Sequence, residues 1–181
     1  VVKNQNTKKL AYAALFLALC LVLPMLTGQI PQIGSMLLPM HIPVLLCGLV
    51  CGWQYGAAVG FVAPLLRSLL FGMPPMYPVA IAMAFELLTY GLVIGLVYRR
   101  MAQKGAAGVY AALLTAMVAG RLVWGVAEVV LLGLGGKAFT AQAFLAGALL
   151  NAVPGIIVQL VLIPAVMAAL QKAGAVKEYA K

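Results

Sequence analysis

The sequence predicts an all-α integral membrane protein with six transmembrane helices and cytoplasmic N and C termini. The first observation behind this prediction is composition: 65% of the 181 residues are hydrophobic, only 8% are charged, and the mean hydropathy is +1.11. Soluble domains carry about 25% charged residues, and a water-soluble chain of this size has no way to bury so much apolar surface. Composition therefore excludes a soluble enzyme, a disordered tail and a nucleic-acid-binding module.

The second observation is the length of the apolar segments. A bilayer core about 30 Å thick requires roughly 20 mostly apolar residues per helix, and no Asp, Glu, Lys or Arg occurs from Leu10 to Leu66. Gly- and Pro-rich turns divide the chain into six expected spans within a single membrane domain, residues 1–181. The expected spans are 10–26, 36–50, 55–71, 77–98, 109–132 and 141–170.

Each boundary between spans has its own sequence signal. The loop Thr27–Gly34 ends the first span, the turn Cys51–Gln54 ends the second, and the proline-containing loop Gly72–Met76 ends the third. A polar connection, Arg99–Gly105, separates the fourth and fifth spans, and the loop Gly133–Thr140 precedes the sixth. The proline-rich loops after the first and third spans are expected to form a stiff cover on the outer side.

The third observation is the distribution of basic residues. With six spans, nine Lys and Arg residues fall on one side of the membrane and only Lys137 falls in a loop on the other. The positive-inside rule makes the basic side cytoplasmic, whereas five or seven spans would put the basic ends on opposite sides. The nine residues are Lys3, Lys8, Lys9, Arg99, Arg100, Lys104, Lys172, Lys177 and Lys181.

Small residues recur at helical spacing in three of the spans. Glycines occur every fourth residue from Gly48 to Gly60, and Gly91 and Gly95 repeat the pattern in the fourth span. Ala14 and Ala18 have the same spacing in the first span. Small residues at this spacing let helix backbones approach closely in lipid, so the glycines predict internal helix packing, and the alanines predict either packing or a face for a partner protein.

Four ionisable residues fall within the expected spans, namely Arg67, Glu86, Arg121 and Glu128. Each costs several kcal/mol in a bilayer unless it is paired or hydrated, so such residues indicate function. Arg121 and Glu128 are seven residues apart and share a helix face. The alternative is that the four residues form two buried salt bridges that only fix helix positions.

Polar residues from five spans are expected to converge on the outer half of the membrane. An ion channel needs polar groups along its whole path, so this asymmetry favours a pocket that is open outside and sealed below. Tyr90 and Trp124 lie near Glu86 and Arg121 in sequence, and either ring can stack on a flat ligand. The predicted substrate-binding residues are His41, Arg67, Glu86, Tyr90, Arg121, Trp124, Glu128 and Asn151.

Motifs for catalysis are missing from the sequence. There is no Walker phosphate loop, no paired acidic metal motif and no Gly-x-Ser-x-Gly. Cys20, Cys47 and Cys51 lie in apolar stretches and show neither a disulfide framework nor metal-ligand spacing. We therefore expect no catalytic residue, no metal and no cofactor.

Four segments give the chain a family resemblance that covers nearly its whole length. These are Met40–Gly48, Gly52–Gly60, Gly72–Pro75 and Phe85–Gly91. With six short spans and basic inner termini, they resemble the substrate-binding S component of energy-coupling-factor (ECF) vitamin transporters. The resemblance implies that Ala14-x-x-x-Ala18 docks on a transmembrane coupling subunit, and that the loop after the first span closes the pocket.

The resemblance also implies the function and the partners. An S component binds a water-soluble vitamin or related micronutrient in an outward-facing pocket of the bacterial or archaeal plasma membrane, and two ATPase subunits drive uptake through the coupling subunit. No nucleic acid takes part. The alternatives are a self-sufficient small transporter or channel, which would transport alone, and a membrane enzyme or assembly factor.

The charges suggest the kind of vitamin. If Arg67 and Glu86 satisfy each other, Arg121 and Glu128 remain to meet the ligand from one helix. An arginine fork suits a carboxylate, which favours a carboxylate-bearing vitamin such as pantothenate. A pyridoxine or pyrimidine ring would instead depend more on Trp124 and Tyr90.

Overall fold

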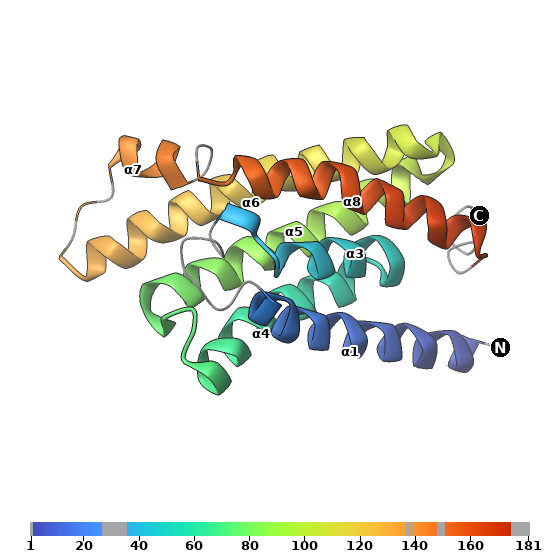
Figure 1. The fold of residues 1–181 in the computed structure, drawn as a ribbon, viewed down its shortest axis with the longest axis horizontal. Helices are drawn as coiled ribbons and strands as arrows, with labels where there is room; N and C mark the ends of the chain where they lie inside the picture. The colour runs from blue at the N-terminus through green and yellow to red at the C-terminus, as the bar shows by residue number, and fades with distance from the viewer. Residues whose placement is uncertain (1, 27–35, 137, 139, 148–150, 175–181) are drawn as a thin grey trace.

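The computed structural model describes residues 2–26, 36–136, 138, 140–147 and 151–174, and within them every regular element is helical (Figure 1). Five helical stretches are long and apolar enough to cross a membrane, and a sixth helix is shorter. The elements are α1 (Val2–Leu26), α3 (His41–Cys51), α4 (Trp53–Phe71), the π-helical turn η1 (Met76–Ala80), α5 (Ile81–Met101), the 3₁₀ turn η2 (Ala102–Lys104), α6 (Ala106–Leu134), α7 (Ala141–Leu145) and α8 (Val153–Lys172).

Helix α3 is shorter than the predicted second span. Its 11 residues extend over about 16 Å at 1.5 Å per residue, roughly half of a bilayer core. Residues 36–40 do not continue it, because Leu38 has a φ of 51°, a left-handed conformation that interrupts a helix. Nine of the helix's residues are buried, so α3 forms the centre of the bundle.

The predicted sixth span, 141–170, is divided into two helices. Helix α7 ends at Leu145, and α8 begins at Val153 after a turn at Asn151 and Ala152. Pro154 lies in the first turn of α8, where the missing N–H is not needed for helix hydrogen bonding. The hydropathy of this stretch does not show the division, since both parts are apolar.

The packing of α4 against α5 confirms the prediction from glycine spacing. A Cβ at Gly91 would lie 2.2 Å from the carbonyl group of Gly56, and a Cβ at Gly60 would lie 2.2 Å from the carbonyl oxygen of Leu87. Gly48 and Gly56 are also in close contact: a Cβ at Gly56 would lie 2.7 Å from the Cα of Gly48. The backbones of α3, α4 and α5 therefore touch directly. Any side chain larger than hydrogen at these positions would keep them apart.

Consecutive helices run back and forth along one axis of the bundle. In Figure 1 the beginning of α1, the end of α5 and the end of α8 lie at the same end. These are the elements that carry or adjoin the predicted cytoplasmic basic residues, so the arrangement fits the predicted sorting of charge. That the bundle crosses six times, and that this end faces the cytoplasm, stay predictions.

Candidate functional site

Two buried polar side chains and a partly buried arginine, from three different helices, meet in the bundle. An oxygen of Glu86 on α5, Oε1, lies 3.0 Å from Nη1 of Arg121 on α6 and 3.4 Å from Nε2 of His41. His41 is the first residue of α3. His41 and Glu86 are each 1% exposed. We call His41, Glu86 and Arg121 the polar cluster.

Tyr90 packs against the polar cluster from one turn further along α5. Its ring meets the His41 ring edge to face, with 5.2 Å between centroids and 73° between planes. A Cβ at Gly120 would lie 3.0 Å from the Tyr90 ring, so this glycine makes room for the ring where α6 passes α5. Tyr90 thus fixes the position of His41 relative to α6.

The polar cluster does not satisfy its own hydrogen-bonding groups. Nδ1 of His41 and Nη2 of Arg121 are buried and have no hydrogen-bond partner among the described residues, whereas Oε1 of Glu86 is in ion-pair distance of Arg121 and His41. Each such group costs about 1–3 kcal/mol when it stays unpaired. A pair of charges that serves only to hold two helices together is expected to satisfy its donors and acceptors, so the unpaired atoms point to a polar ligand.

Glu128 lies on the same helix as Arg121, two turns toward the end of α6, and is 6% exposed. Seven residues correspond to about 10 Å along the helix axis. Neither an ion pair nor a hydrogen bond is found for Glu128 within the described part of the chain. The predicted shared face of Arg121 and Glu128 is therefore turned inward.

Trp124 connects the polar cluster to α7. The guanidinium carbon of Arg121 lies 5.9 Å from the centre of the Trp124 ring, within the range of a cation–π interaction. Trp124 also stacks on Phe144 of α7, with 6.1 Å between centroids and 26° between planes. Phe144 was not among the predicted site residues. No sequence pattern indicates it, because the position of α7 beside α6 depends on the conformation of the preceding loop, which the sequence does not predict.

The structure separates Arg67 from the other predicted site residues. Its guanidinium group donates a hydrogen bond from Nη1 to the backbone carbonyl of Leu21 on α1, at 2.5 Å, and its Cζ lies 5.3 Å from the centre of the Phe71 ring. The condition under which Arg121 stays free for the ligand, that Arg67 and Glu86 satisfy each other, is therefore not met: Glu86 pairs with Arg121. Arg67 connects α4 to α1.

Two further polar residues on or near α8 differ from expectation. Asn151 is exposed and lies in the turn before the helix, and in the described residues no contact joins its side chain to the polar cluster. Gln159 is 1% exposed, and its Nε2 has no hydrogen-bond partner among the residues described. In the sequence, Gln159 is a single polar residue within an apolar stretch.

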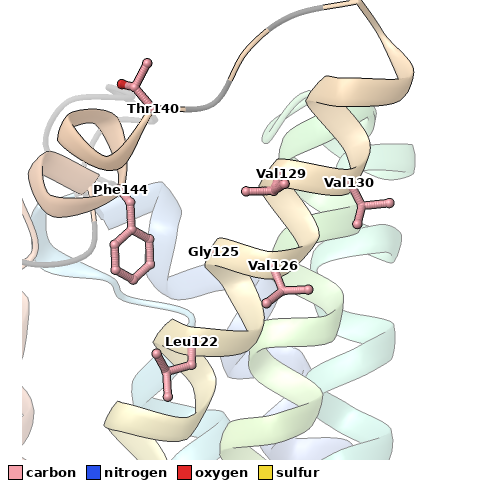
Figure 2. A pocket seen from close by; sticks show the side chains of 7 residues that line it. All are labelled: Leu122, Gly125, Val126, Val129, Val130, Thr140 and Phe144. Carbon is pink, nitrogen blue, oxygen red and sulfur yellow. The ribbon is translucent and has the colours of Figure 1, made fainter.

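A groove lies between α6 and α7, away from the polar cluster. Figure 2 shows it from close by, with Phe144 pointing from α7 toward Gly125 on α6. Its volume is about 370 Å³, and its lining is almost entirely apolar. The lining residues are Leu122, Gly125, Val126, Val129, Val130, Thr140 and Phe144. A groove of this chemistry does not bind a water-soluble ligand through polar contacts.

The two alanines of α1 are exposed, whereas Ala13 beside them is buried. Ala14 and Ala18 therefore lie on the side of α1 that faces away from the bundle. Of the two interpretations of their spacing, packing inside this chain and a face for a partner, the exposure fits the second. The predicted cover after α1, Thr27–Gly34, lies outside the described residues.

Comparison with known proteins gives one family. The family model described as "ECF transporter, substrate-specific component" matches residues 8–168, which include the whole polar cluster and both alanines. No curated protein and no solved structure gives a significant match.

Proposed function

The chain belongs to the family of the substrate-specific components of ECF transporters, and from this premise we propose that the polar cluster is the substrate-binding site. Members of this family are membrane-embedded substrate-binding subunits rather than enzymes. The substrate of this chain is then a water-soluble vitamin or related micronutrient, taken up from outside the cell across the plasma membrane.

The observation that carries this proposal is the set of unpaired polar atoms in the polar cluster. His41, Glu86 and Arg121 come from three helices, and His41 and Arg121 each have a buried nitrogen, Nδ1 and Nη2, without a hydrogen-bond partner among the described residues. A ligand that pairs these atoms recovers their desolvation cost. Trp124, which contacts Arg121, provides an aromatic edge for a ring, and the side chain of Arg121, 13% exposed, marks the accessible side.

The preference for a carboxylate-bearing vitamin such as pantothenate loses part of its basis. It assumed that Arg121 has no carboxylate partner within the chain, but Arg121 pairs with Glu86 at 3.0 Å. Arg121 still has one unpaired nitrogen, Nη2, so a neutral hydrogen-bond acceptor suits it as well as a carboxylate does.

The proposal also includes the partners. The exposed face of α1 with Ala14 and Ala18 docks on a transmembrane coupling subunit, and two ATPase subunits supply the energy. A bulky residue on such a face holds a partner helix away. The double variant Ala14→Trp/Ala18→Trp is therefore expected to abolish vitamin uptake by cells and to leave vitamin binding by the purified protein unchanged.

The control for this experiment is Tyr12→Trp, for which uptake should stay normal, since Tyr12 is also exposed on α1 but lies about 160° around the helix from Ala14. If the double variant lost binding as well as uptake, the alanine face would be part of the internal packing. If uptake continued in the absence of a coupling subunit, the chain would be a self-sufficient transporter.

A further inference from the structure

Glu128 carries a buried charge that no cation of the chain balances within the described residues. Arg121, on the same face of α6, is 3.0 Å from Glu86. Arg67, the other buried cation, donates to the backbone carbonyl of Leu21 on α1. Glu128 itself is 6% exposed and has no basic partner among the described residues.

The site as a whole therefore has one acidic side chain more than it has arginines. Glu86 pairs with Arg121 at 3.0 Å, and the buried Glu128 has no such partner among the described residues. An unbalanced charge inside a membrane protein is costly and marks a binding or transport role. Beside this acidic pair, His41 is 1% exposed and its Nδ1 has no hydrogen-bond partner in the described structure, which indicates a ligand independently of the charge count.

We propose that the ligand of this site carries a positively charged nitrogen that binds the carboxylate of Glu128, and a hydrogen-bond acceptor that binds Nη2 of Arg121. The inference rests on the proposed function, because it concerns the same site. The two groups of the ligand lie up to about 10 Å apart, the rise of seven helical residues. The positive nitrogen restores neutrality, and the acceptor pairs a nitrogen that is buried and unpaired.

The proposal selects among vitamins by charge. Anionic vitamins add a second uncompensated negative charge beside Glu128, and neutral vitamins leave the first in place. Of the two arginines that suggested an anionic ligand, one is paired with Glu86 and the other is bonded to α1. The site therefore favours cations over anions through repulsion of the wrong ligand as well as attraction of the right one.

The experiment compares three sets of vitamins in thermal-shift titrations of the detergent-purified protein. The cationic set is thiamine and pyridoxamine, the neutral set is riboflavin, pyridoxine and nicotinamide, and the anionic set is pantothenate and biotin. We expect a raised melting temperature with at least one cation and with no anion. A shift from the anionic or the neutral set alone would overturn the charge argument and keep the proposed function, whereas no shift with any set would refute the proposed function itself.

Variants locate the cation within the site. Glu128→Gln keeps the shape of the side chain and removes its charge, so it should weaken binding of the active cation about ten- to a hundred-fold, the range for a hydrogen bond between charged groups. Glu178→Gln changes the net charge by the same amount outside the described residues and should leave affinity unchanged. Equal affinity in wild type and Glu128→Gln would contradict the assigned position of the charge.

Discussion

The two sides of α5 have opposite construction. On the side of α4, Gly91 lies against the backbone of Gly56 with no room for a single methyl group. On the side of α6, Glu86 and Tyr90 extend toward Arg121 and Gly120, and two nitrogens of the polar cluster, Nδ1 of His41 and Nη2 of Arg121, stay unpaired within the described residues. On the α4 side the two helix backbones are in direct contact, and on the α6 side polar side chains lie between the two helices.

The difference separates stability from binding. Glycine contacts between backbones give a large area of van der Waals packing, so α4 and α5 form a rigid support for the polar side of α5. A rigid support is what a binding site needs, because small displacements of its polar groups weaken a ligand contact. We therefore expect substitutions on the α4 side to change stability, and substitutions on the α6 side to change affinity.

The largest expected effect is on the α4 side. Gly91→Ala places a Cβ 2.2 Å from backbone atoms of Gly56, and backbone cannot move aside as a side chain can. We expect a loss of about 3 kcal/mol or more in the free energy of unfolding, at the upper end of the range for overpacking. Thermal melts of the purified protein would measure it.

The matched control is Gly133→Ala on α6. A Cβ there meets no atom within 4 Å, so the substitution should be neutral or stabilising by up to about 1 kcal/mol, because alanine favours a helix over glycine. If Gly91→Ala melted at the temperature of Gly133→Ala, the direct backbone contact between α4 and α5 would be disproved.

A smaller effect on the free energy of unfolding distinguishes Arg67 from Arg121. Arg67→Gln removes the hydrogen bond to Leu21 and should lower the free energy of unfolding by about 1.5–3 kcal/mol, the range for a hydrogen bond from a charged group. Because Arg67 contacts α1 rather than the polar cluster, vitamin affinity should stay near that of the wild type. A loss of affinity without a loss of stability would return Arg67 to the binding site and remove the contrast between the two sides of α5.

The sequence predicted the part of this structure that depends on spacing. Glycines four residues apart have little use other than close packing, and the contacts of Gly48, Gly56, Gly60 and Gly91 confirm it. Buried charges in a membrane are rare enough to indicate a site, and Glu86 and Arg121 do lie together. His41 and Tyr90, two more of the predicted site residues, lie beside them.

Spacing does not predict how each helix is rotated relative to its neighbours. Arg67 and Arg121 have the same chemistry and a similar apolar context, yet one turns toward α1 and the other toward α5. Nor does hydropathy show where an apolar stretch breaks, so Asn151 was placed inside a span although it is exposed before α8. Both errors concern tertiary contacts, which no local pattern contains.

The central claim is that the polar cluster binds the vitamin rather than only joining α5 to α6. Its most direct test is titration of the purified Arg121→Ala variant with the vitamin that gives the largest thermal shift in wild type, with Arg67→Gln as the control for loss of a buried arginine. We expect Arg121→Ala to weaken binding about ten- to more than a hundred-fold and Arg67→Gln to bind as wild type does. Unchanged affinity in Arg121→Ala with a lowered melting temperature would show that the pair with Glu86 is structural, and that the vitamin binds elsewhere.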